Sequence, residues 1–173
     1  GPLHPDYTPN LTDTTGRETY EDGDALDTFK WNNWHDDQGE GAYVIESGKP
    51  YGVDSKVYHY TTLAGYKPEV TFQLNAANVD ATAYAYETDM MLVGTDYNRP
   101  QFQIRTNDNN LLFTYHIERA ADGKVNLLDG DTNKIATIAM DGEWFRLRVE
   151  YIDVTADVAH VRFYVNGERV GAD

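Results

Sequence analysis

Two carboxylic acids stand two positions apart in the stretch AYAYETDMMLVG, residues 83–94. If this stretch is a β-strand, Glu87 and Asp89 share one face, because successive strand side chains alternate between faces. A retaining glycosidase uses such a pair, with the two carboxyl groups about 5–5.5 Å apart. The first hypothesis raised by the sequence is therefore glycoside hydrolysis.

Charge and composition restrict the alternatives. The chain has 173 residues and a formal net charge of −15, from 14 basic and 29 acidic residues. An acidic surface repels phosphate, so neither nucleic acid nor an anionic membrane is an expected partner. No apolar run approaches the roughly 20 residues of a membrane span, so membrane insertion is not expected. The absence of cysteine excludes disulfides, thiolate nucleophiles and zinc–thiolate sites.

The chain is also rich in tyrosine, with 13 Tyr residues. An acidic, tyrosine-rich chain without cysteine is typical of bacterial extracellular modules that contact sugars, so we expect an extracellular or cell-surface location. The opening GPLH is typical of the remnant of a removed purification tag. A signal peptide would then belong to a longer native polypeptide.

Strands with one buried face are indicated by a two-residue alternation of apolar and polar side chains. The alternation occurs in 43–47, 55–62, 69–76, 81–94, 101–106, 111–119, 143–152 and 159–170. Asp-Gly at 122–123 and Asn-Gly at 166–167 predict hairpin turns of the primed type, and Asp-Gly at 141–142 is a further turn signal. No segment sustains a helical period. The prediction is an all-β fold, an antiparallel β-sandwich of the jelly-roll type.

Domain organisation follows from the same pattern. Residues 1–18 are polar and proline-rich and are expected to be a tag remnant and linker, and residues 19–173 are expected to form one domain. Within it, residues 19–42 lack periodicity. They predict a loop-rich opening with one short strand near Leu26 to Trp31.

Residues 142–170, GEWFRLRVEYIDVTADVAHVRFYVNGERV, resemble the signature hairpin of concanavalin A-like (laminin G-like) jelly rolls. The resemblance rests on Gly142, Trp144, Phe145, Tyr164, Val165, Asn166 and Gly167, and the upstream strands extend it over roughly residues 20–170. The superfamily includes lectins, adhesion modules and glycosidases, so it implies the fold more than the function. Such folds usually continue past the last hairpin. The resemblance therefore leaves three alternatives for the last strand or strands: another segment supplies that edge, the missing piece was lost, or the fold closes differently. Our hypothesis is that the native polypeptide is longer.

The resemblance also bears on the paired acids. Jelly-roll endo-glucanases carry E-x-D-x-E or E-x-D-x-x-E on this strand, so the third acid would fall at Met91 or Leu92. Neither side chain can transfer a proton, which argues against catalysis. Two other interpretations of Glu87 and Asp89 remain open: they pair with basic residues on neighbouring strands, or they bind a ligand.

Further candidate ligand-binding residues lie on the polar face of other predicted strands. Gln103, Arg105, Arg146 and Arg148 have this parity, as do Gln101, His116, His160, Arg162 and Tyr164. If the strands share a sheet, this face could hydrogen-bond sugar hydroxyls. A solvated, ion-paired face is the alternative.

Aromatic residues extend this hypothesis. Trp34 and Tyr97 are expected near loops, where exposed aromatic rings can stack on pyranose rings. Alternatively, Trp34 and its neighbour Trp31 cover the edge of the core.

Metal sites have weak support. Residues 129–140 begin like a calcium loop, but Lys134 replaces the required glycine and Met140 the required glutamate, so a hairpin turn is predicted instead. The acidic run Glu21 to Asp27 could hold a structural Ca²⁺ ion. No cofactor is expected to be required.

The sequence thus yields three functional hypotheses. The first is a non-catalytic extracellular carbohydrate-binding or adhesion module of a larger bacterial surface or secreted protein, with a glycan or a cell-surface protein as partner. The second is a structural protein–protein interaction domain, on a cell surface or a phage particle, without a sugar site. The third is a glycoside hydrolase or lyase that draws an acid from elsewhere.

Overall fold

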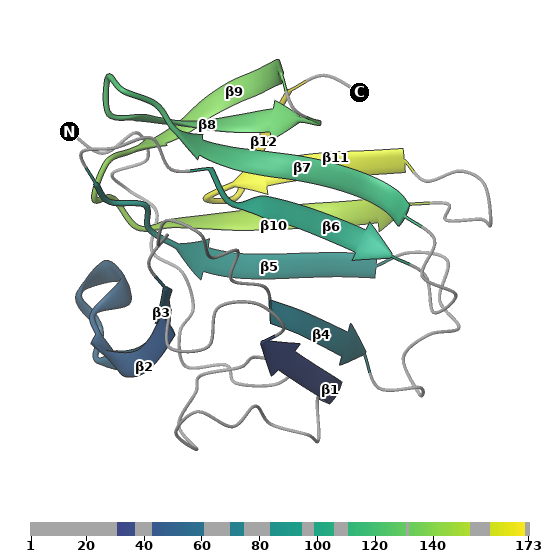
Figure 1. The fold of residues 1–173 in the computed structure, drawn as a ribbon. Coiled ribbons are helices and arrows are strands. Elements are labelled where there is room, and N and C mark those ends of the chain that lie inside the picture. Colours follow the sequence, from purple (N-terminus) through teal and green to yellow (C-terminus); the bar gives the residue numbers. More distant parts are fainter. Residues whose placement is uncertain are drawn as a thin grey trace. The chain divides into compact units, whose positions relative to one another are not determined.

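A computed structural model of the chain describes residues 31–36, 43–60, 70–74, 84–94, 99–105, 111–130, 132–152 and 160–171 (Figure 1). The chain divides into two compact units, Asn10–Ala81 and a second unit of Gly1–Pro9 with Thr82–Asp173. Apart from the one-turn 3₁₀ helix Pro50–Gly52, the regular elements of the described residues are antiparallel strands. The predicted all-β class is confirmed.

The second unit contains two four-stranded sheets among its described residues (Figure 1). The first sheet has the order β12-β11-β10-β5, formed by Glu168–Val170, His160–Val165, Phe145–Ile152 and Tyr84–Met90. The second has the order β6-β7-β8-β9, formed by Gln101–Arg105, Leu111–Arg119, Lys124–Asp129 and Asn133–Met140. Every pair of neighbours is antiparallel. The two sheets form the layers of a β-sandwich.

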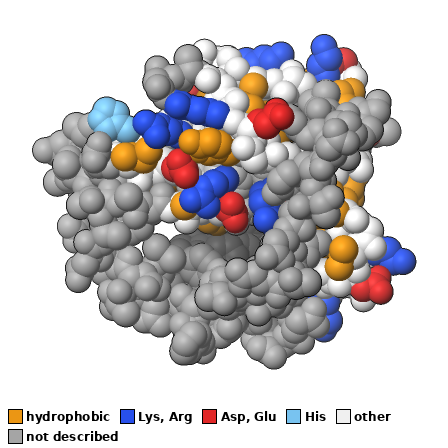
Figure 2. All heavy atoms as spheres, turned by 180° about the vertical axis from the view of Figure 1, so that it is seen from behind, with side chains coloured by type: hydrophobic (Ala, Val, Ile, Leu, Met, Phe, Trp, Pro, Cys, Tyr) orange, Lys and Arg blue, Asp and Glu red, His pale blue; other side chains and the backbone are white. Residues whose placement is uncertain are grey.

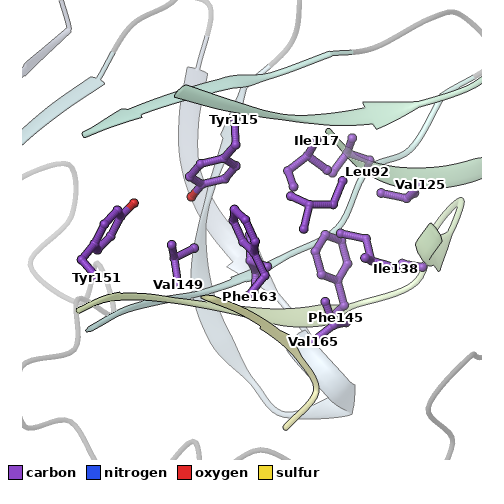
Figure 3. Close-up of a cluster of buried hydrophobic side chains, with 13 residues drawn as sticks. Leu92, Tyr115, Ile117, Val125, Ile138, Phe145, Val149, Tyr151, Phe163 and Val165 are labelled. Atoms are coloured by element: carbon purple, nitrogen blue, oxygen red, sulfur yellow. The ribbon is translucent and has the colours of Figure 1, made fainter. Parts of the chain in front are cut away.

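The core lies between the inner faces of these sheets (Figure 3). Strand β10 shows the predicted alternation along its whole length: Phe145, Leu147, Val149 and Tyr151 are buried, and the residues between them are partly exposed. The facing sheet contributes buried side chains from three strands, among them Tyr115, Ile117, Val125, Leu127 and Ile138. Burial of this apolar area is the main force that holds the two layers together.

Aromatic rings dominate one part of the core. Phe102 stacks on Tyr115 with ring centroids 5.0 Å apart, and Phe163 meets Tyr115 edge-on at 5.6 Å. Phe163 belongs to the first sheet and Tyr115 to the second, so this edge-to-face contact joins the two layers. Offset and edge-on geometries are those that aromatic quadrupoles favour.

Two hairpin predictions have different outcomes. Between β11 and β12, Asn166 and Gly167 both have positive φ, 49° and 82°, so the primed two-residue turn is confirmed. Between β7 and β8 only Gly123 has positive φ, 84°. The hairpin is present, but the primed turn is wrong because the connection is four residues long, 120–123, and closes by a bond from the Gly123 amide to the Ala120 carbonyl.

Strands β8 and β9 carry weaker sequence signals than the others. In β8 the four central residues, 125–128, are all buried, so polar and apolar positions do not alternate. Strand β9 pairs with β8 through two register shifts, which also interrupt its period. Asp129 pairs with Asn133 where the two strands join, so the predicted hairpin in place of a calcium loop is confirmed.

The first unit contains two pairs of strands. Strand β1, Trp31–Asp36, pairs with β4, Val70–Leu74, and β2, Tyr43–Gly48, pairs with β3, Ser55–Tyr60. The loop placement of Trp34 is wrong: it lies within β1, opposite Phe72. The alternation of large and polar residues that would mark this strand is interrupted by a register shift between Trp31 and Asn33.

Candidate functional site

The paired acids lie on β5, and the neighbouring strand β10 supplies basic partners. Asp89 stands directly opposite Arg146, and Glu87 stands directly opposite Arg148. Their neighbours Tyr86 and Val149 have the opposite parity, and Val149 is buried in the core, so the four charged side chains project from the outer face. The predicted pairing of both acids with arginines on a neighbouring strand is confirmed.

The Asp89–Arg146 pair has a bidentate geometry. Arg146 donates from Nε to Asp89 Oδ1 at 2.9 Å and from Nη2 to Asp89 Oδ2 at 3.0 Å. The Asp89 side chain is only 7% exposed and the Arg146 side chain only 12% exposed. Two parallel charge-assisted hydrogen bonds fix both groups in one orientation. Both oxygens of the Asp89 carboxylate are therefore engaged.

The β11–β12 turn holds the backbone of Arg146 in place. The Asn166 amide donates to the Arg146 carbonyl at 2.9 Å, and the Arg146 amide donates to Asn166 Oδ1 at 2.8 Å. Asn166 is buried and occupies the left-handed region that asparagine tolerates well. One residue thus forms the turn and anchors the strand that carries the arginine.

Arg148 bridges two carboxylates on the more exposed part of the face. Its Nε donates to Glu150 at 3.0 Å, and its Nη1 donates to Glu87 at 3.2 Å. Partial burial lowers the pKa of Arg148, but hydrogen bonds and charges from Glu150 and Glu87 outweigh this effect, so the pKa rises above its usual value. The guanidinium is therefore a permanent cation here.

The remaining outer residues of this sheet follow from the strand register. Tyr164 lies opposite both Arg148 and Arg169, and Arg162 lies opposite Glu150. We call this surface the arginine face; it consists of Glu87, Asp89, Arg146, Arg148, Glu150, Arg162, Tyr164 and Arg169. It carries four of the eight arginines of the chain and three carboxylates, although the whole chain has a charge of −15. Figure 2 shows basic and acidic side chains close together on the molecule seen from behind.

The positions where a glucanase would carry its third acid are clear in the structure. Met91 is exposed just after β5, and Leu92 is buried in the core. Retaining hydrolysis needs one carboxylate that can attack and one carboxyl group that can donate a proton. Here Glu87 and Asp89 are both bonded to arginines. The chemistry that this arrangement supports is recognition of polar or charged groups.

The structure separates the sequence-predicted site residues into different sheets. Glu87, Asp89, Arg146 and Arg148 lie together, as expected. Gln103 and Arg105 lie on β6, in the other sheet, so the condition that all these strands share one sheet is not met. Parity along a strand specifies a face but does not specify the sheet. Tyr97 and the side chains of Arg105 and Trp34 lie outside the described residues.

His116 also lies on the second sheet. It is buried opposite Leu128, and its Nδ1 donates a hydrogen bond to the Gly130 carbonyl. His116 thus has the predicted outer parity on its strand, but it does not share a sheet with the arginines. Its imidazole is part of the packing of β7 against β8.

Two further members of the arginine face, Glu150 and Arg169, have signals in the sequence that identify them as outer residues of this sheet. Glu150 has the same parity as Arg146 and Arg148 on β10. A two-residue turn at Asn166–Gly167 fixes the register of its strands, and this places Arg169 beside Tyr164. The Asn166–Gly167 turn is therefore the sequence signal that identifies Arg169 as a neighbour of Tyr164.

Metal ligation has no support within the residues that the structure describes, where no group of three or more His, Asp or Glu side chains could hold an ion. The acidic run Glu21 to Asp27 and Asp131 lie outside those residues. For the same described residues, no helix is long and apolar enough to cross a membrane.

Comparisons with known proteins identify no relative. No protein family model matches the chain, and no curated protein or solved structure matches it either.

Proposed function

We propose that the chain is a non-catalytic carbohydrate-binding or adhesion module of a larger extracellular or cell-surface bacterial protein. Membership of the concanavalin A-like jelly-roll superfamily is part of this proposal and rests on the β10–β11–β12 hairpin sequence, residues 142–170. The observation that carries the proposal is the arginine face. Its carboxylates are bonded to arginines, and this arrangement suits recognition better than proton transfer.

The proposed contact surface centres on Tyr164. This ring lies between Arg148 and Arg169, which stand opposite it on the two neighbouring strands, and Arg162 follows two positions away on the same face. A tyrosine offers an apolar ring for stacking on a pyranose, and arginines offer paired N–H donors for carboxylate or sulfate groups. Four arginines against three carboxylates leave this face locally positive although the whole chain is strongly acidic, and the proposed ligand is therefore an anionic polysaccharide.

The glycan proposal is tested by measuring affinity for a uronate-containing polysaccharide, a sulfated polysaccharide and a neutral glucan. We expect binding to one of the two anionic polymers. Replacement of both Arg162 and Arg169 by alanine should weaken it at least about tenfold, consistent with the loss of two charge-assisted contacts. Lys124→Ala removes an exposed cation from the other sheet and serves as the matched control.

A second candidate function is a structural protein–protein interaction domain. The observation that favours it is the network in which Arg148 bridges Glu87 and Glu150, because an ion-paired surface can complement a charged protein surface. Failure of all three polysaccharides to bind would contradict the glycan proposal and leave this candidate. Release of reducing ends from any of them would contradict both and support a hydrolase.

A further inference from the structure

Two tyrosine hydroxyls in the sandwich interior lack a hydrogen-bond partner within the described structure. Tyr115 on β7 is 0% exposed and Tyr151 on β10 is 3% exposed. The two residues come from opposite sheets. Figure 3 shows their hydroxyls pointing toward one another, into the space between the layers.

A third phenol belongs to the same group. Tyr86 lies on β5 opposite Val149, two pairs along the ladder from Tyr151. Burial raises the pKa of Tyr86, Tyr115 and Tyr151, and the charge of an ionised Tyr86 would raise the other two further. The Tyr86 hydroxyl has a hydrogen-bond partner in the Thr88 side chain, so it differs from the other two. The three phenols stay neutral over the physiological pH range.

The unpartnered hydroxyls require a physical explanation. More than about 90% of buried polar groups in proteins are hydrogen-bonded, because a buried group without a partner costs roughly 1–3 kcal/mol. The surrounding side chains, such as Val149, Phe102 and Phe163, are apolar and offer neither donor nor acceptor. A guest that satisfies the hydroxyls must be neutral and must both donate and accept hydrogen bonds. Water meets this requirement and is the usual occupant of polar interior sites.

We propose that the space between the hydroxyls of Tyr115 and Tyr151 is a buried water-binding site in which bound water bridges the phenols of the two sheets. The bridge links β7 to β10 by hydrogen bonds. The rest of the core has a different character, because Ile117, Leu127 and Ile138 contribute only carbon atoms there. The sandwich thus has a hydrated tyrosine end and a dry aliphatic end.

Tyrosine-to-phenylalanine substitutions test the site, because they remove one oxygen and keep the ring. If water bridges the hydroxyls, Tyr115→Phe and Tyr151→Phe should each lower Tm by about 3 °C. The double variant should lose less than the sum, because both hydroxyls bind the same water cluster. Tyr164→Phe on the outer face is the matched control and should leave Tm unchanged.

A dry interior predicts the opposite change in Tm. If the interior is dry, each phenylalanine removes an unsatisfied hydroxyl and Tm should rise, which would overturn the proposal. Additive losses in the double variant would also overturn it, because they would indicate that the hydroxyls act separately.

Water-selective NMR provides a direct readout that does not depend on stability. Cross-peaks between long-lived water and the aromatic ring protons at positions 115 and 151 should be present in the native protein. They should be absent from the double variant, which has phenylalanine at both positions. Absence of these cross-peaks from the native protein would contradict the site. None of these outcomes depends on whether the arginine face binds a glycan.

Discussion

The outer faces of the two sheets are held by different interactions. The arginine face has opposite charges directly across the β5–β10 ladder, with Asp89 facing Arg146 and Glu87 facing Arg148. The outer face of the second sheet instead has neutral hydrogen bonds. There, Thr137 donates to Asn126 Oδ1 at 2.8 Å, and His116 donates to the Gly130 carbonyl. Similar strand ladders thus support one surface with ion pairs across the ladder and one on which these two hydrogen bonds between described residues are neutral.

The contrast indicates where recognition is more plausible. On the second sheet, His116, Asn126 and Leu128 are all buried although they have the outer parity, so these residues serve packing. On the first sheet, Arg148, Arg162 and Arg169 remain partly or fully exposed. Exposed, ordered charges contribute little to stability but can orient a partner.

The largest effect is expected for Asp89→Asn. This substitution leaves the nearly buried Arg146 guanidinium without its counter-charge and should lower the free energy of unfolding by about 3 kcal/mol. Urea denaturation at pH 7 measures the loss. Asp54→Asn, in the exposed Lys49–Asp54 pair at 3.9 Å, is the control and should have no measurable effect. A loss for Asp89→Asn no larger than the control would remove the distinction between the faces.

The free energy of unfolding at alkaline pH tests the burial of Tyr115 in the core between the two sheets. Because burial raises the pKa of Tyr115, the unfolded chain releases this phenol proton near pH 10 and the folded chain retains it. The free energy of unfolding should therefore fall above pH 10, by about 1.4 kcal/mol per pH unit for each such tyrosine. In Tyr115→Phe the decline between pH 10 and 11 should be smaller by about 1 kcal/mol, because the unfolded phenol is only half ionised at pH 10. Parallel profiles for the two proteins would contradict the buried phenol.

A smaller effect is expected on the neutral face. Asn126→Ala removes the acceptor of the Thr137 hydroxyl and should cost about 1 kcal/mol. Because neither group is charged, the cost should be the same at 0.05 M and at 1 M NaCl, concentrations chosen to bracket roughly complete screening. Urea denaturation at the two salt concentrations checks this. A marked salt dependence would show that charge contributes to this face as well.

The smallest effect is expected for Glu87→Gln on the arginine face. Both partners of the 3.2 Å contact with Arg148 are substantially exposed, so the loss should be about 0.5 kcal/mol or less. It should vanish in 1 M NaCl, where the Debye length is only about 3 Å. A larger loss that resists salt would mean that Glu87 is held as firmly as Asp89.

Local patterns in the sequence predicted much of the fold. The alternation in β10 and β11 identified their buried residues because each strand has one apolar face toward the core. The alternation does not identify strand β8, because Asn126 and Leu128 are buried on the face that usually meets solvent. A strand buried on both sides loses the alternation on which the prediction depends.

The candidate site was only partly predictable because it depends on which strands are neighbours. Parity placed Glu87 and Asp89 away from the core, but their partners lie about 60 positions later in the chain. Nothing local specifies that β5 pairs with β10, or that Gln103 belongs to the other sheet. Residue Arg169 is the exception, because the Asn166–Gly167 turn sets its register locally.

The central claim is that Glu87 and Asp89 on β5 are held by arginines on β10. A double-mutant cycle on Asp89→Asn and Arg146→Gln, measured by urea denaturation, tests it most directly. We predict a coupling free energy of about 2 kcal/mol, with the double variant no less stable than either single variant. Additive losses, with no coupling between the two positions, would contradict the account.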